Sequence, residues 1–249
     1  MQTIIADNIA SAHEAVVKLI MDGNEDVNDL TTEDNELTFE YPTPVNIHIN
    51  HPNIPPFYSP ALRFGARSLD EYAKQVLNPR MLVDKEDRPD FAYLYSNLIF
   101  EYPEGTPFKI YDKNGKVVRV DWPYGNGRGD GTNQIEYVIR KLEENPSTRR
   151  AVVSLFEPNG FETADEPPCL QHIMFMVRNG KLNMHALFRS NDALSAWGSN
   201  SYALMRLQEM VVNRLEGVEW GWMETTSLSM HVYFKRDSEE LKRFKALWH

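Results

Sequence analysis

The most constraining feature of this 249-residue sequence is an Asn179-Gly180 pair that separates two largely apolar segments. The segments are residues 170–177 and 181–187. An Asn-Gly pair in this position is the strongest short-range signal for a β-hairpin, because both residues tolerate the positive φ angles of its two-residue turn. The sequence therefore predicts two antiparallel neighbouring strands here, and any fold for the chain must accommodate them.

Apolar residues at helical spacing predict five helices along the rest of the chain. Ser68 and Asn133 are each followed three residues later by glutamate, which is the pattern of a capping box. Asp237 is likewise expected to cap the last helix. The predicted helices are residues 8–22, Ser68 to Leu77, Asn133 to about Glu144, Asn200 to Leu215 and the segment that follows Asp237.

Further strands are predicted at residues 37–49, which prolines interrupt, at residues 151–156 and at residues 225–234. In this order, helices and strands do not alternate as strict β-α-β units. We therefore expect an α/β protein of the α+β type, in which a mixed β-sheet is flanked by helices. No boundary interrupts the pattern, so a single domain of residues 1–249 is expected.

Charge and cysteine content disfavour several classes of function. A formal net charge of −10 and a pI of about 5.2 argue against a nucleic-acid or membrane surface, although a few local arginines could hold a small phosphorylated ligand. One cysteine permits no intrachain disulfide, and the chain has neither a signal-like start nor a long apolar run, so we expect a cytoplasmic protein. Zinc-ligand spacing, a phosphate-binding loop and a dinucleotide fingerprint are also missing, and we expect no metal.

Two segments carry reactive or cationic residues in unusual settings. Two prolines precede Cys169 and fix the backbone there, although a lone cysteine beside a strand is more often buried and inert than nucleophilic. Arg149 and Arg150 stand between a predicted helix and a predicted strand. They are either simply solvated or placed to bind an anion through their guanidinium groups.

Two further segments gather polar side chains at predicted strand ends. Arg189-Ser-Asn-Asp192 is followed by Trp197-Gly-Ser-Asn200, and together they offer donors and acceptors; the alternative is a polar turn with a helix cap at Ser199 or Asn200. Ser229, His231 and Tyr233 share one face of a predicted strand. The alternative for these three is a half-exposed strand face with a satisfied histidine.

The order and spacing of these segments resemble the motifs of the thymidylate synthase family. The resemblance extends from about Tyr124 to Tyr233 and is closest to the short archaeal, methanogen-type branch, so it implies that family's fold. Its pieces are Tyr124-Gly125, Asn133-Gln-Ile135, the paired-arginine motif Pro146-Ser-Thr-Arg-Arg150, the nucleophile motif Pro167-Pro-Cys169, the phosphate-and-ring motif Arg189-Ser-Asn-Asp192, Asn200, and the ribose motif His231-Val-Tyr233.

The resemblance implies conversion of dUMP to dTMP, with 5,10-methylenetetrahydrofolate as both carbon donor and reductant. Cys169 would add as a thiolate to C6 of the pyrimidine, and Arg189 would lower the pKa of the thiol and also bind the phosphate. Addition makes C5 nucleophilic toward the one-carbon unit. Tyr124 would then act as the base for the C5 proton, through a water molecule.

The other roles follow from the same resemblance. The amide of Asn200 complements the O4 and N3–H edge of uracil, which favours dUMP over dCMP. Asp192 is assigned to catalysis and, together with Trp197, to the folate. In this family the paired arginines reach the partner's site, so a homodimer is implied. Phosphate is assigned to Arg149, Arg150 and Ser190, and the ribose 3′-hydroxyl to His231 and Tyr233.

Several positions depart from the family pattern. Leu170 stands where a histidine usually follows the nucleophile, Phe188 replaces a glutamine, and Ser229 replaces an aspartate. The N-terminal phosphate-binding arginine and the Glu-x-x-Trp segment have no match, and the chain ends sixteen residues after Tyr233, without a long tail to exclude water. Two alternatives therefore stay open. One is a hydroxymethylase acting on dUMP, dCMP or CMP, in which water attacks the methylene intermediate, and the other is a non-catalytic nucleotide-binding relative.

Overall fold

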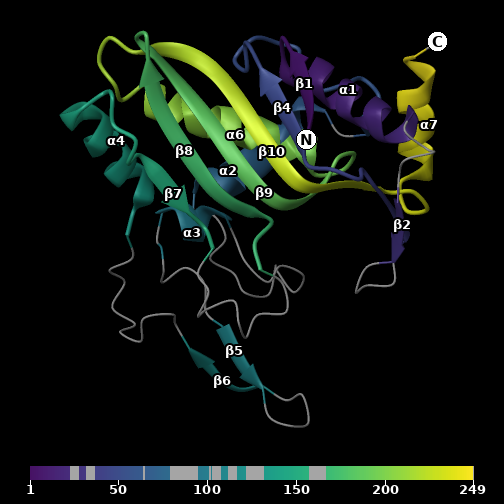
Figure 1. Ribbon diagram of the computed structural model, residues 1–249. Helices are drawn as coiled ribbons and strands as arrows, with labels where there is room; N and C mark the ends of the chain where they lie inside the picture. Colours follow the sequence, from purple (N-terminus) through teal and green to yellow (C-terminus); the bar gives the residue numbers. More distant parts are fainter. Residues whose placement is uncertain are drawn as a thin grey trace.

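A mixed β-sheet forms the centre of the chain and confirms the predicted fold class (Figure 1). A computed structural model describes residues 1–22, 28–31, 37–63, 65–78, 95–100, 102, 108–111, 117–121, 132–156 and 167–248. Eight strands make up the main sheet in this part of the chain, and two more pair separately. The main strands are β1 (Gln2–Ala6), β2 (Asn28–Thr31), β3 (Leu37–Glu40), β4 (Val45–Ile49), β7 (Val152–Ser154), β8 (Leu170–Arg178), β9 (Lys181–Asp192) and β10 (Glu219–Tyr233), and the separate pair is β5 (Phe108–Tyr111) with β6 (Val117–Asp121).

The strand β10 organises the main sheet, whose order is β1-β4-β10-β9-β8-β7. It runs parallel to β9 and antiparallel to β4 and β3. The strands β8 and β9 form the predicted hairpin, with φ angles of 52° at Asn179 and 73° at Gly180, as the predicted turn requires. Because β8 is antiparallel to its neighbour, its start lies at the same end of the sheet as the ends of β9 and β10.

Helices cover one face of this sheet, and α2 and α6 lie behind β8, β9 and β10 in the view of Figure 1. Burial alternates accordingly along β9: Met184 and Ala186 are fully buried, whereas His185 and Leu187 on the opposite face are half-buried. The helices of the described part are α1 (Ile9–Asp22), α2 (Ala66–Leu77), α3 (Tyr95–Phe100), α4 (Gln134–Glu144), α6 (Trp197–Val212) and α7 (Ser238–Ala246). None of them combines the length and hydropathy of a bilayer-spanning segment.

The helix α4 forms as its sequence predicts. The side chain of Asn133 accepts hydrogen bonds from the backbone N–H groups of Ile135 and Glu136, which satisfies two donors that the helix itself leaves unpaired. Its buried face is the predicted one, and the helix ends at Asn145 before a proline. The buried residues of this face are Ile135, Val138, Ile139 and Leu142.

The predicted start of α2 at Ser68 is wrong, because the helix begins at Ala66 after Gly65. The Gly65 carbonyl accepts hydrogen bonds from the N–H groups of Ser68 at 3.1 Å and Leu69 at 3.3 Å. The carboxylate of Glu71 pairs with Arg67 one turn earlier, at 3.0 Å from Nε, instead of reaching back to a cap. Such a pair stabilises the additional first turn.

The predicted cap of α6 is wrong, whereas Asp237 is the N-cap residue of α7 as predicted but makes no side-chain hydrogen bond to the helix. The helix α6 begins at Trp197, and the N–H of Asn200 bonds to the Ala196 carbonyl at 2.9 Å, so Asn200 lies inside the first turn rather than at the cap. Burial of the Trp197 indole draws this turn into the core. Asp237 does precede α7, but its carboxylate binds Arg236 rather than the helix N–H groups.

Several strand boundaries differ from the prediction. The segment 37–49 forms two strands, β3 and β4, because its prolines interrupt the ladder. The strand β7 is shorter than residues 151–156, whereas β9 and β10 are longer than predicted. The polar residues at the end of β9 stay in the sheet because β10 pairs with them as far as Asp192.

Candidate active site

Cys169 lies immediately before β8, half-buried against the apolar core. Its carbonyl accepts a hydrogen bond from the backbone N–H of Arg189 at 2.8 Å. The Arg189 guanidinium folds back onto the same loop and donates to the Pro167 carbonyl from Nε at 3.2 Å and from Nη2 at 2.8 Å. The backbones of Cys169 and Arg189 are therefore hydrogen-bonded to each other. The backbone N–H and the side chain of Arg189 both bind the loop that contains Cys169.

A tyrosine that the motif comparison did not select reaches the same loop. The hydroxyl oxygen of Tyr95, in α3, accepts a hydrogen bond from the N–H of Leu170 at 3.3 Å. Leu170 follows Cys169 directly, so this phenol stands beside the candidate nucleophile. Nothing in the local sequence around residue 95 points to a partner 75 positions away.

The end of β10 brings the predicted ribose residues next to Asp192. His231 is the register partner of Asp192 in the parallel ladder between β9 and β10. The rings of His231 and Tyr233 pack edge to face with centroids 5.1 Å apart. The Arg236 guanidinium lies 4.0 Å from the centroid of the Tyr233 ring, which is a cation–π contact. These side chains thus form one cluster at the same end of the sheet as Cys169.

His231 is buried, and its surroundings favour a neutral imidazole. Burial is the largest influence and lowers the pKa of His231, because removal from water penalises the charged ring. The carboxylates of Asp192 and Glu40 and a backbone hydrogen bond at Ser229 oppose this effect, while Arg236 adds to it. A neutral imidazole can both donate and accept a hydrogen bond, and the predicted contact of His231 with a sugar hydroxyl stays a prediction.

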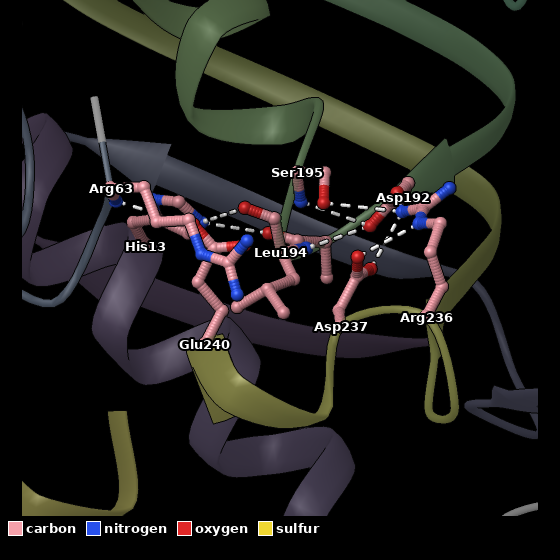
Figure 2. Close-up of polar contacts among 9 residues, drawn as sticks. His13, Arg63, Asp192, Leu194, Ser195, Arg236, Asp237 and Glu240 are labelled. Atoms are coloured by element: carbon pink, nitrogen blue, oxygen red, sulfur yellow. Dashed lines mark hydrogen bonds and ion pairs between the residues drawn. The ribbon is translucent and has the colours of Figure 1, made fainter. Parts of the chain in front are cut away.

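Asp192 is held in a network with a cation that the sequence comparison missed (Figure 2). One carboxylate oxygen accepts the N–H groups of Leu194 and Ser195, both at 3.0 Å. The other oxygen pairs with Arg236, which also binds Asp237 at 2.6 Å. Burial opposes the charge of Arg236, but the hydrogen bonds and attraction of the two carboxylates outweigh it and raise the pKa of the guanidinium. Asp192 thereby shapes the loop that leads into α6.

His13 supports this loop from the opposite side, as Figure 2 also shows. The side chain is completely buried, and its Nε2–H donates to the carbonyls of Ala193 at 2.8 Å and Leu194 at 3.2 Å. Burial lowers the pKa of His13 to about 4, although the two carbonyl contacts raise it in part. The ring packs against Gly198, where a Cβ atom would approach Nδ1 to 2.6 Å. Protonation would add an N–H at Nδ1, which has no hydrogen-bond partner in the described part of the chain, so this packing disfavours the charged ring.

This environment predicts that acid destabilises the fold. The folded-state pKa of His13 lies below the unfolded value of 6.5, so the unfolded chain binds the proton more readily. Its contribution is complete above pH 6.5 and falls by about 3 kcal/mol between pH 6.5 and pH 4. Chemical denaturation measured across this range in wild type and His13→Gln, which keeps a donor but does not titrate, should show a flatter profile for the variant.

A matched control for that experiment is His51→Asn, because His51 is an exposed histidine. The pH profile of this variant should follow that of the wild type. If the free energy of unfolding of His13→Gln falls with pH as steeply as that of the wild type, His13 is not the source of the acid sensitivity.

Asn200 and Trp197 project from the first turn of α6 into separate contacts. The Asn200 side chain is almost buried, and its Oδ1 accepts the hydroxyl proton of Tyr72 at 2.5 Å. The Trp197 indole is fully buried, and its N–H donates to the Thr225 hydroxyl at 3.0 Å. Trp197 therefore anchors the turn that presents Asn200, and its predicted contact with folate stays a prediction.

Comparison of the sequence with models of protein families identifies the family of this chain. The model described as thymidylate synthase matches residues 13–244. The chain belongs to the thymidylate synthase family. The motif resemblance predicted from the sequence is thereby confirmed, and the family supports a one-carbon transferase that acts on a nucleotide and a folate.

Individual relatives come from archaea, as the methanogen-type motif forms predict. A Methanocaldococcus jannaschii protein named "Putative thymidylate synthase" is 31% identical over 262 residues, which span 100% of each chain. A Methanosarcina acetivorans protein of the same name is 36% identical over 165 residues, which cover 66% of this chain and 61% of that relative. A Haloferax volcanii "Thymidylate synthase" is 34% identical over 116 residues, covering 45% and 34% of the two chains.

The paired arginines of the family do not meet Cys169 within one chain. Arg149 and Arg150 are exposed before β7, where the carbonyl of Ala151 accepts the N–H of Phe175 at 2.9 Å. Phe175 is six residues along β8 from Cys169, a distance of about 20 Å at the usual strand rise. This separation argues against contact between these arginines and Cys169 of the same chain, and the predicted role across a dimer stays a prediction.

A carboxylate from another strand compensates for one departure from the family pattern. Ser229 replaces the expected aspartate, and its hydroxyl donates to the Glu40 carboxylate at 2.8 Å. Glu40 lies in β3 and is the register partner of His231. A carboxylate therefore lies near His231, the predicted ribose residue, across the sheet.

Three predictions from the sequence remain: the roles of Ser190 and Tyr124, and the expectation that no metal is needed. Ser190 is half-buried in β9, opposite Ser229 of β10. Tyr124 lies outside the described residues, so its position relative to Cys169 stays a prediction. Within the described ranges, no group of three histidine, cysteine or acidic side chains is arranged to hold a metal ion.

Proposed function

We propose that this protein converts dUMP to dTMP, using 5,10-methylenetetrahydrofolate, through a covalent adduct between Cys169 and C6 of the pyrimidine. One observation carries the proposal: Cys169, Arg189 and the His231–Tyr233 pair converge at one end of the sheet. A thiol, a guanidinium and a neutral imidazole beside a phenol match the ring, phosphate and sugar of a nucleotide.

The proposed chemistry starts with attack of the Cys169 thiolate on C6, which breaks the 5,6 double bond and places electron density on C5. C5 then forms a bond to the one-carbon unit of the folate. Loss of the C5 proton and cleavage of the bond between that carbon and the folate give a methylene intermediate. A hydride from the folate completes the methyl group as the Cys169 thiolate leaves C6. Tyr95 becomes a second candidate for the base beside Tyr124, because its oxygen accepts from the N–H next to Cys169. This hydrogen bond places a phenol oxygen, a group that can take part in proton transfer, beside the candidate nucleophile.

The open face of the sheet supports the proposed homodimer. Along β10, Trp222, Glu224 and Thr226 are only half-buried, and Leu228 is 50% exposed. Apolar side chains on an uncovered sheet face lose contact with water when a second subunit packs there. Such packing would also bring Arg149 and Arg150 of one protomer toward its partner, as the proposed phosphate role requires.

A hydroxymethylase is the second candidate, and the residue after the nucleophile favours it. Leu170 stands where a histidine is usual in the family and is 2% exposed. Because a leucine side chain has no polar atom, it offers no hydrogen bond to the reacting ring. Loss of polar groups here changes how the methylene intermediate is protected from water. If water attacks that intermediate, the product carries a hydroxymethyl group instead of a methyl group.

Product identity tests the proposed function directly. The protein is incubated with dUMP and methylenetetrahydrofolate, and the nucleotide and folate products are identified by mass. Methylated nucleotide with dihydrofolate is the expected result. Hydroxymethylated nucleotide with tetrahydrofolate would establish the second candidate, and no product from correctly folded protein would reject both in favour of a nucleotide-binding relative.

Replacing Tyr95 with phenylalanine is expected to slow tritium release from C5-labelled dUMP by about 10²-fold in the presence of methylenetetrahydrofolate. The change keeps the ring that packs against the core and removes only the hydroxyl. Affinity for dUMP should change little, as equilibrium binding can show. Tyr124→Phe is the matched comparison: slow release in that variant, with normal release in Tyr95→Phe, would assign the base to Tyr124.

A further inference from the structure

The contact between Tyr72 and Asn200 defines which end of the Asn200 amide faces outward. The Tyr72 hydroxyl, from α2, lies 2.5 Å from Oδ1 of Asn200 in α6. This separation is normal for an O–H···O hydrogen bond and shorter than the range for N–H···O. The phenol is therefore the donor and the amide oxygen the acceptor, and the amide nitrogen of Asn200 turns away from Tyr72.

A second hydrogen bond joins the same two helices close to Tyr72. The Tyr202 hydroxyl, two residues after Asn200, donates to the Asp70 carboxylate at 2.6 Å. Burial and this bond raise the pKa of Tyr202 to about 12, so the phenol stays protonated and remains a donor at physiological pH. The helices α2 and α6 are thus joined by two separate hydrogen bonds, so the bond at Tyr202 can be removed while the contact between Tyr72 and Asn200 is kept.

The outward end of the amide is a donor. Asn200 is 8% exposed, and its Nδ2 group has no hydrogen-bond partner among the residues that the structure describes. A ligand that meets this nitrogen must therefore offer an acceptor. Uracil offers its O4 carbonyl at the corresponding edge, whereas cytosine offers an amino group there, which would place two donors against each other.

We propose that Tyr72 is a positioning residue for base selection: by holding the Asn200 amide in one orientation, it makes the site accept uracil and reject cytosine. The inference rests on the proposed function, in which Asn200 contacts the edge of the pyrimidine. Without Tyr72, the amide can rotate by half a turn. Its oxygen then accepts from the cytosine amino group and its nitrogen donates to N3, so cytosine is no longer opposed.

The test compares two substrates in wild type and Tyr72→Phe. Tritium release from C5-labelled dUMP and dCMP gives kcat/KM for each, and titration with unlabelled dUMP and dCMP gives both Kd values. The preference for dUMP over dCMP is expected to fall about tenfold in Tyr72→Phe, the effect of losing one hydrogen bond that fixes orientation. General loosening of the fold would instead lower kcat/KM equally for dUMP and dCMP, and the ratio of the two values would stay unchanged.

Tyr202→Phe is the matched control, because it removes the neighbouring interhelical hydrogen bond and leaves the Asn200 contact intact. Its preference ratio should equal that of the wild type. An unchanged ratio in Tyr72→Phe would overturn the inference even if dUMP is turned over normally. If the wild type turns over neither nucleotide, the proposed function fails, and the ratio of the two Kd values alone decides the role of Tyr72. If the protein binds neither nucleotide, the inference about Tyr72 is overturned as well.

Discussion

Replacing Cys169 with serine is expected to reduce tritium release from C5-labelled dUMP by about 10³-fold or more. A serine hydroxyl is almost entirely protonated at neutral pH, so it cannot replace a thiolate as the group that attacks C6. The substitution is nearly isosteric, and the backbone bond from Arg189 to residue 169 does not depend on the side chain. The fold and the affinity for dUMP should therefore be preserved.

Two measurements make this result specific. Wild type with dUMP and methylenetetrahydrofolate should show a mass adduct at Cys169 that is absent in Cys169→Ser. Unfolding and dUMP binding of the variant serve as controls for its structure. Release of tritium from Cys169→Ser at the wild-type rate would show that the covalent mechanism is wrong, whatever the product of the reaction.

Mixing two inactive variants is expected to restore activity if the arginines act across the dimer. The first variant is Cys169→Ser and the second replaces both Arg149 and Arg150 with alanine. Each homodimer lacks a necessary group at both sites. A mixed dimer has one site with both defects and one with none, so random exchange of equal amounts should recover about a quarter of the wild-type activity.

The separation within one chain is the reason for this expectation. Arg149 and Arg150 are exposed near the middle of β8, about 20 Å along the sheet from Cys169. Mixing after unfolding and refolding, with each variant treated alone as the control, allows the subunits to exchange. Full activity of the double arginine variant, or a mixture that stays inactive, would contradict the proposed role of the partner subunit.

The local sequence determined those turns and helices that are stabilised by contacts between residues close together in the chain. The Asn179-Gly180 turn is set by two residues that accept positive φ, and the cap and buried face of α4 are set by Asn133 and by apolar spacing within three turns. The ordered motifs around Cys169, Arg189 and His231 identified the family for the same reason, since each motif is a short run. The cap prediction failed at α6 because burial of the Trp197 indole moved the helix start, and at α2 because Arg67 pairs with Glu71 and adds a first turn.

The tertiary structure alone decided which distant side chains complete the site. Tyr95 reaches Leu170 across 75 positions, and Tyr72 reaches Asn200 across 128. Glu40 joins the cluster because β3 pairs with β10, and Arg236 joins it because the turn after β10 brings its side chain to Asp192. These pairings depend on which helices bury their apolar faces against which strands, a property of the whole core that no local pattern specifies. The sequence by itself therefore determined the family and predicted the nucleophile, and packing determined which distant side chains lie beside the predicted site residues.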